Sequence, residues 1–156
     1  MKVRTVEGWL LHFSERVRAA IGLREMLYVL PDEPATYPVP RAPAHASHVV
    51  MWQQHLVPLI DLNVCITGAG EKSAHKLVGI VACAAANDAD AGTALGALVM
   101  CRAPERILVS DGQACELPAA PAGWRSISAA CFRHPLHGPV PILDLPAILV
   151  RVWEPV

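Results

Sequence analysis

The stretch VPLIDL at residues 57–62 recurs almost letter for letter as VPILDL at residues 140–145, 83 positions later in a chain of 156 residues. In each copy a Val-Pro pair precedes two aliphatic residues, an aspartate and a leucine. Proline is tolerated at the edge or bulge of a strand, and the aspartate can bond nearby backbone to turn the chain. We therefore expect each copy to close one small β-barrel of about 70 residues, the two barrels sharing an apolar interface.

Short apolar runs separated by polar or proline-containing breaks fill the rest of the chain. Fourteen prolines and ten glycines leave little room for long helices, since proline removes a backbone donor and clashes inside a helix. About ten short strands are the alternative, at the spacing typical of sandwiches and barrels. The expected strands span residues 9–13, 17–21, 24–30, 49–52, 56–60, 76–84, 95–100, 106–109, 128–132 and 140–143.

The breaks predict how these strands are connected. Residues 14–16, 53–55 and 87–93 are expected hairpin turns. The segment PDEPATYPVPRAPAH at residues 31–45 holds five prolines. We expect it to be an extended or irregular connection that stays out of the middle of any sheet.

Two segments also admit a helix. Residues 14–28 have a polar face, although Gly22 and the β-branched Val17 and Ile21 disfavour a helix there. The Ala-rich residues 77–86 remain ambiguous because periodicity cannot assign a short apolar run.

Composition narrows the class of protein. The apolar fraction of 53% indicates a globular chain, and 13 basic against 14 acidic residues give a net charge of −1 without any basic block, so we expect no nucleic-acid partner. The apolar runs at residues 77–86 and 94–101 are shorter than the roughly 18 residues of a membrane helix, so we expect no membrane insertion. The start of the chain lacks a signal-peptide pattern, which favours a cytoplasmic protein.

Residue types that carry chemistry are present without a convincing catalytic pattern. The five cysteines form no C-x-x-C pair, and we expect most of them to be buried thiols. There is no G-x-S-x-G motif and no cysteine with a persuasive activating context, which disfavours an esterase or a cysteine hydrolase. Asp61 and Asp144 are interpreted as turn formers and not as a catalytic dyad. An alternative function is a metal-binding β protein that uses His45, His48 and His55, or the H-P-L-H at residues 134–137.

The run REMLYVLPDEPATYPVPRAPAHASHVVMWQQHLVPLIDL at residues 24–62 resembles the CheW family, the adaptor domain of bacterial chemosensory arrays. Glu25 falls on the family's strand glutamate and Pro43 on its loop proline, while the VPLIDL stretch matches its closing motif. GALVMCRAPERILV at residues 96–109 and GPVPILDL at residues 138–145 resemble strands of its second half. The similarity extends over essentially the whole chain.

The resemblance implies an all-β fold of two linked five-stranded SH3-like barrels, with short helical turns at most. Residues 1–156 would form a single CheW-like domain made of two pseudo-repeated β subdomains. The implied function is that of a non-catalytic adaptor without a cofactor. It would bridge a CheA-type histidine kinase and chemoreceptor cytoplasmic tips, or related array proteins.

Carried over by position, Leu23, Glu25 and Met26 would lie on the strand used for kinase and receptor contact. The alternative is that Glu25 is a solvated charge and Met26 belongs to the core. At the hairpin the chain departs from the family, with Gln53 and Gln54 in place of Arg-Gly. The loss of arginine removes a bidentate donor, and the loss of glycine removes an inexpensive turn with positive φ.

Three further departures lie at His48, Met51 and Met100, in place of the family's glycine, asparagine and aspartate. We expect Met51 and Trp52, if exposed, to provide a more apolar contact, the alternative being that Trp52 is part of the core. These changes indicate a divergent member. Its alternative role would be in pilus motility, or as a decoy that occupies an array position without kinase coupling.

Overall fold

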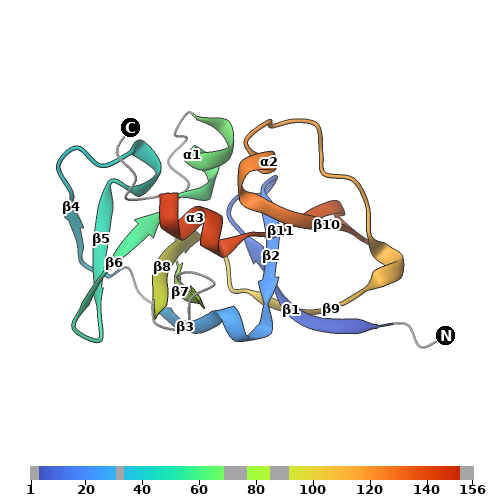
Figure 1. The fold of residues 1–156 in the computed structure, drawn as a ribbon, viewed down its shortest axis with the longest axis horizontal. Coiled ribbons are helices and arrows are strands. Elements are labelled where there is room, and N and C mark those ends of the chain that lie inside the picture. Colours follow the sequence, from blue (N-terminus) through green and yellow to red (C-terminus); the bar gives the residue numbers. More distant parts are fainter. Residues whose placement is uncertain (1–3, 31–33, 69–76, 85–91, 152–156) are drawn as a thin grey trace.

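The computed structural model describes residues 4–30, 34–68, 77–84 and 92–151, with side chains described up to residue 149. Within these ranges the chain forms eleven strands and six short helical segments (Figure 1). The strands are β1 (Thr5–His12), β2 (Arg18–Gly22), β3 (Met26–Leu30), β4 (Thr36–Pro38), β5 (His48–Trp52), β6 (His55–Ile60), β7 (Leu77–Ala84), β8 (Thr93–Met100), β9 (Glu105–Ser110), β10 (Ser128–His134) and β11 (Gly138–Leu143). The helical segments are α1 (Leu62–Thr67), α2 (Trp124–Ile127), α3 (Leu145–Arg151) and the 3-10 turns η1 (Leu23–Glu25), η2 (Ala44–Ala46) and η3 (Asp111–Gln113).

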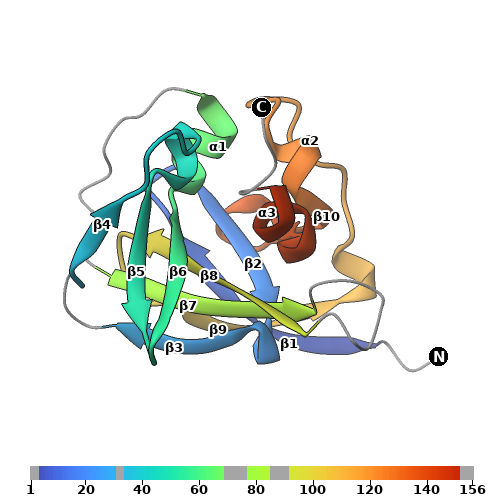
Figure 2. The ribbon, with the colours of Figure 1, turned by 60° about the vertical axis from the view of Figure 1, so that its left-hand side comes forward.

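These strands form two sheets, each the wall of a small barrel (Figure 2). Sheet A has the order β10-β11-β2-β1-β9, and sheet B has the order β3-β7-β8-β6-β5-β4. The expected all-β fold of two linked barrels is therefore confirmed, except that sheet B gains β4 as a sixth, three-residue strand at its edge. This edge position agrees with the proline content of the segment, since proline cannot donate to an inner ladder.

The two copies of the repeated motif occupy equivalent places in the two sheets. VPLIDL is contained in β6 and the start of α1, and VPILDL in β11 and the start of α3. β6 pairs with β5 antiparallel and with β8 parallel, while β11 pairs with β10 antiparallel and with β2 parallel. The order β5-β6-β8-β7-β3 thus matches β10-β11-β2-β1-β9 strand for strand.

This equivalence shows how the chain is shared between the barrels. Sheet B is built from consecutive strands, β3 to β8, whereas sheet A combines the hairpin β1–β2 with β9, β10 and β11. The sheets are therefore not made by the first and second halves of the chain, as the repeat alone suggested. The N-terminal hairpin supplies the two strands that the second copy lacks.

The aspartates of the repeat turn the chain as expected, and each begins a helix. Asp61 is the N-cap of α1, and its Oδ1 accepts a hydrogen bond from the backbone N of Asn63 at 3.0 Å. Asp144 Oδ1 accepts from the backbone N of Ala147, in the first turn of α3, at 3.3 Å. Both carboxylates satisfy donors that a helix leaves free at its start, which fits a structural role.

The main core lies where the two barrels and the helices meet. It takes buried side chains from both sheets and from all three α-helices, so the expected shared apolar interface is present. A second cluster lies within sheet B and a third within sheet A. The buried residues of the main core are Leu11, Phe13, Ala19, Ile21, Ala46, Ile60, Leu62, Ile66, Val81, Leu98, Met100, Trp124, Ile127, Leu143, Leu145, Ile148 and Leu149.

Most strand predictions are confirmed, with shifts of a few residues at their ends. The strand expected at residues 24–30 starts only at Met26, because η1 comes first. A helix over residues 14–28 is wrong, and the described part of residues 77–86 is strand. Of the turn expected at residues 87–93, residues 87–91 lie outside the described ranges. None of the helices in the described ranges is long and apolar enough to cross a membrane.

Candidate protein-binding surface

Glu25 is held by its own turn. Its Oε1 accepts a hydrogen bond from the backbone N of Gly22 at 2.7 Å, which closes the 3-10 turn η1. The side chain is half-buried, so it is neither a freely solvated charge nor a fully exposed contact. Leu23 is also half-buried, and its carbonyl oxygen accepts from Trp9 Nε1 at 3.2 Å. Both residues therefore help to fix the route from β2 into β3.

Met26 lies against the main core. It is half-buried, and its thioether closely approaches Gly79 on β7, where an added Cβ would lie 3.1 Å from the Met26 sulfur. Methionine is suited to filling such an irregular gap because its side chain is unbranched and flexible. The geometry supports the core interpretation of Met26.

The hairpin β5–β6 presents Met51 outward and Trp52 inward. Met51 is 52% exposed, whereas Trp52 is half-buried and packs against the second core cluster inside sheet B. Successive side chains of a strand point to opposite faces, which explains why the two neighbours differ. Of the apolar pair expected from the sequence, only Met51 is therefore exposed to any large extent.

The hairpin turn consists of Gln53 and Gln54, and both have positive φ, at 46° and 66°. This is the backbone of the two-residue turn that matches the twist of a β-hairpin and that glycine or asparagine usually occupies. The turn with positive φ is therefore kept without glycine, at the cost of backbone strain in the two glutamines. The ladder from His48 to Leu59 imposes the turn on two glutamines, and both side chains are exposed.

Met51 belongs to a patch of exposed apolar side chains, most of which was not predicted from the sequence. Leu56 lies directly opposite Met51 in the ladder, and Tyr37 on β4 lies opposite Val49, two residues before Met51 on the same face. Tyr37, Met51 and Leu56 are 50%, 52% and 62% exposed. We call these three residues the hairpin patch. The alternation of inward and outward side chains along β5 could have indicated that Met51 is exposed. Only the strand register places Tyr37 and Leu56 on the same face as Met51.

Two more exposed apolar side chains lie on β3. The pairing of β3 with β7 shifts between Met26 and Tyr28, so Leu27 is the extra residue of a bulge. Leu27 and Tyr28 are both exposed, although neighbours on a regular strand would face opposite sides. In Figures 1 and 2 the tip of the β5–β6 hairpin and β3 lie at the same, lower end of the molecule.

The histidines within the described ranges do not assemble into a metal centre. His45, His48 and His55 belong to no group of three metal-ligating side chains, and no such group occurs in the described part of the chain. His48 Nδ1 is 2.9 Å from Ser47 Oγ, and burial lowers the pKa of His45. The ring centroids of His134 and His137 are 4.8 Å apart, and the two rings are tilted by 31°. The metal-binding alternative drawn from the sequence therefore receives no support.

The cysteines are all free, and only Cys131 is buried, so the expectation that most would be buried is wrong. Cys65 is half-buried, and its pKa is raised to about 12 by burial and by the nearby charge of Asp61. Burial likewise raises the pKa of Cys83. A nucleophilic cysteine needs a lowered pKa, so neither thiol has the environment of a catalytic nucleophile.

A cavity of about 300 Å³ opens on sheet A. It is mostly apolar, and Asp111 is its single carboxylate. Because acid–base or dyad chemistry requires converging ionisable groups, this cavity lacks the features of an active site. The lining residues are Val6, Gly8, Ala20, Ile21, Gly22, Ile107, Val109, Ser110, Asp111, Ala114, Ala130, Cys131, Phe132 and Ile142.

The two linked sheets, with their matching strand order, define a paired-barrel fold. A similar solved structure is that of the scaffolding protein TtCheW from Thermoanaerobacter tengcongensis, with a TM-score of 0.68 over 90% of each chain and 13% sequence identity. The chain thus has a divergent CheW-like fold. No protein-family model matches the sequence, and a search of curated proteins found no match.

Proposed function

We propose that this protein is a non-catalytic adaptor of a bacterial chemosensory system, with residues 1–156 acting as one domain in the cytoplasm. It would bridge chemoreceptor cytoplasmic tips and a CheA-type histidine kinase, or related array proteins, through protein–protein contacts. The observation that carries the proposal is the structural likeness to a scaffolding protein along 90% of both chains. The resemblance of residues 24–62 to the family pattern agrees with the proposal.

The contact surface that we propose is the hairpin patch together with Leu27 and Tyr28. Methionine and aromatic side chains are enriched in the centres of protein interfaces, because they bury large apolar areas when a partner covers them. Gln53 and Gln54 would lie at the rim of this surface as exposed hydrogen-bonding groups.

The other residues expected to contact a partner take a supporting role in this proposal. Leu23, Glu25 and Met26 shape the entry into β3, and Trp52 packs against the second core cluster inside sheet B. They would influence binding by holding Leu27, Tyr28 and Met51 in position.

One feature favours a second candidate function. The hairpin tip carries two glutamines where the family pattern has Arg-Gly, and glutamine lacks the charge and the fork of donors that make arginine a strong interface residue. The protein would then hold its place in an array, or act in pilus motility, without coupling a receptor to the kinase. Separate binding measurements with kinase and receptor distinguish the two functions.

The test is binding of the purified protein to a CheA-type barrel domain and, separately, to a receptor tip. Met51→Glu and Leu56→Glu should weaken binding at least tenfold, which corresponds to about 1.4 kcal/mol. Leu136→Glu is the matched control, since Leu136 is 83% exposed in the β10–β11 turn and lies outside the proposed surface. Failure of the wild-type protein to bind either partner would contradict the adaptor function, and equal losses in all three variants would contradict the surface.

Glu25 needs a pair of variants because its carboxylate has a structural partner. Glu25→Gln keeps an oxygen that can accept from Gly22 N and removes the charge, whereas Glu25→Lys removes both. If Glu25 acts only through its turn, Glu25→Gln should bind like the wild type. Loss of binding in Glu25→Gln would show that the charge itself contacts the partner.

A further inference from the structure

Two cysteines from separate segments lie side by side at the edge of sheet A. Cys115 follows the turn η3, and Cys131 lies in β10. Their sulfur atoms are 3.5 Å apart, and the backbone N of Cys115 donates to the carbonyl oxygen of Cys131 at 3.0 Å. The neighbouring residues Ala114 and Phe132 form an antiparallel bridge, so Cys115 and Cys131 are directly opposite each other.

This arrangement suits a covalent bond between the two sulfurs. Opposed residues of an antiparallel pair have Cα atoms about 4.5–5.5 Å apart, and disulfides form when this separation is about 4.4–6.8 Å. The sulfurs need to approach by roughly 1.5 Å to reach the bonded distance of about 2.05 Å. Rotation of the two side chains can supply such a movement, because the backbone is already paired.

The two thiols differ in access. Cys115 is half-buried and open to a small oxidant, whereas Cys131 is 5% exposed. Burial, followed by the hydrogen bond with Cys115, raises the pKa of Cys131 to about 12. Because Cys131 is buried and Cys115 is half-buried, an oxidant from solution reaches Cys115 first. The pair thus consists of an accessible thiol and a sheltered partner.

We propose that Cys115 and Cys131 form a reversible oxidation site that closes into a disulfide when the protein meets a peroxide. In the first step the Cys115 sulfur attacks hydrogen peroxide, which gives a sulfenic acid on Cys115 and releases one water. In the second step the Cys131 sulfur attacks the sulfenic sulfur, the sulfur–sulfur bond forms, and the hydroxyl leaves with the thiol proton as water. Two thiols lose two electrons and two protons, and the peroxide becomes two waters.

The disulfide would fasten the long connection after η3 to β10. The loop it closes contains α2, which packs against α1 through the contact of Gly123 with the backbone of Ile66. Closing a loop of this length restricts the unfolded chain. We expect the thermal midpoint Tm to rise on the order of 5–10 °C on oxidation and to return when a dithiol reduces the bond.

Peptide mapping tests the site directly. The full-length reduced protein is treated with a small excess of hydrogen peroxide, its remaining thiols are alkylated, and it is digested with trypsin. Cleavage after Arg106, Arg125 and Arg133 places Cys115 in residues 107–125 and Cys131 in residues 126–133, with one cysteine in each. The expected product is these two peptides joined, lighter than their sum by two hydrogens and separated again by dithiothreitol.

Cys115→Ser should abolish the joined peptide and the rise in Tm. Cys101→Ser, which removes another half-buried cysteine, should leave both unchanged. Because Cys131 is buried, the Cys115 variant carries the test without depending on whether a Cys131 variant folds. Oxidation of Cys115 to sulfinic or sulfonic acid while Cys131 stays open to alkylation would overturn the proposal, as would cross-links spread evenly over all five cysteines.

Discussion

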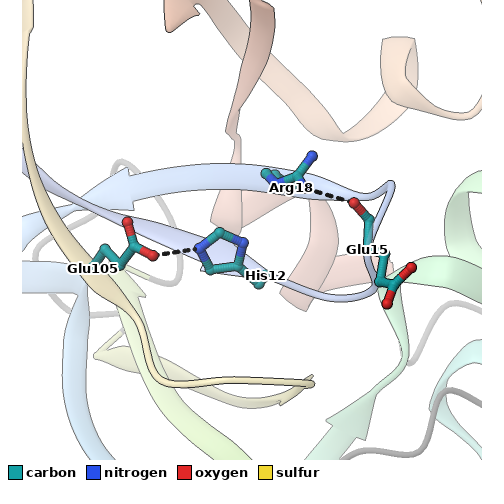
Figure 3. Close-up of polar contacts among 4 residues, drawn as sticks. All are labelled: His12, Glu15, Arg18 and Glu105. Atoms are coloured by element: carbon teal, nitrogen blue, oxygen red, sulfur yellow. Dashed lines mark hydrogen bonds and ion pairs between the residues drawn. The ribbon is translucent and has the colours of Figure 1, made fainter. Parts of the chain in front are cut away.

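His12 and Glu105 are joined across 93 positions of sequence, with His12 Nε2 3.2 Å from Glu105 Oε1 (Figure 3). The histidine is buried at the end of β1, and the carboxylate lies at the exposed start of β9. In the adjacent β1–β2 turn, Arg18 donates to the backbone oxygen of Glu15 at 2.6 Å. Burial lowers the pKa of His12, while Glu105 acts in the opposite direction and offsets part of the effect.

The lowered pKa of His12 predicts a loss of stability in acid. A histidine whose pKa is lower in the folded state than its value of 6.5 in the unfolded chain favours unfolding once protons become available. The contribution of neutral His12 to the free energy of unfolding is fully present above pH 6.5 and is lost as the pH falls through the folded-state pKa. Urea unfolding between pH 8 and pH 5 should show the free energy of unfolding falling with acidification.

His12→Gln is the variant for this dependence, since glutamine does not titrate. The slope of the free energy of unfolding against pH should become shallower and not vanish, because the pKa values of His45 and His137 are also lowered by burial. The readout is the slope and not the absolute stability, which the substitution itself changes. An unchanged slope would show that His12 does not contribute.

The hairpin turn predicts a stabilising substitution. Gln54 has φ 66°, where a side chain with a Cβ is strained, and glycine is free of that strain. Gln54→Gly should raise the free energy of unfolding by about 1 kcal/mol, measured by urea titration. His55→Gly, one residue later in β6, is the matched control and should lower stability. A loss of stability in Gln54→Gly would contradict the strained turn.

The two aspartates of the repeat predict equal and additive losses. Asp61→Ala and Asp144→Ala each remove a carboxylate that accepts from the backbone at a helix start, and each should cost about 1 kcal/mol of unfolding free energy. The double variant should lose about the sum, because the two caps serve different helices. Glu116→Ala, at an exposed residue, is the control and should stay within about 0.5 kcal/mol of the wild type.

At Gly123, where α2 approaches α1, there is no room for even one methyl group. A Cβ on Gly123 would lie 2.5 Å from the carbonyl oxygen and 2.6 Å from the Cα of Ile66, and backbone atoms cannot turn aside as a flexible side chain can. Gly123→Ala should therefore cost about 2 kcal/mol in thermal or urea unfolding. At Gly112 the same substitution meets no atom within 4 Å and should be close to neutral. Equal stability of the two variants would exclude the predicted clash.

The sequence predicted the positions of the strands better than it predicted which strands pair with each other. The apolar runs located β2, β5, β6, β7 and β9 to within one residue at each end, because alternating apolar residues and polar turns are local signals. The start of β1 was expected at Trp9 and lies at Thr5. The boundary of β3 was missed, because the bond from Gly22 N to Glu25 Oε1 tightens the chain into a 3-10 turn that an apolar pattern does not reveal. The helices α1 and α3 were interpreted only as turns, since six and seven residues give too little periodicity.

The candidate surface was predicted in part for the same reason. Met51, Gln53 and Gln54 are exposed, and their place in a hairpin follows from neighbours in sequence. Tyr37 and Leu56 join Met51 only through the strand register, and Leu27 is exposed through a bulge in the pairing with β7. Whether these side chains contact a partner stays a prediction.

By itself the sequence determined an all-β chain with a duplicated strand and turning aspartates, because strand propensity, proline and local hydrogen bonding act over a few residues. Only the tertiary structure decided that β1 and β2 complete the sheet of β9, β10 and β11. It also decided that Cys115 lies opposite Cys131 and that His12 meets Glu105. Such contacts depend on which distant segments bury their apolar faces together. No short segment of sequence determines this, because the outcome is a balance between packing energy and chain entropy over the whole chain.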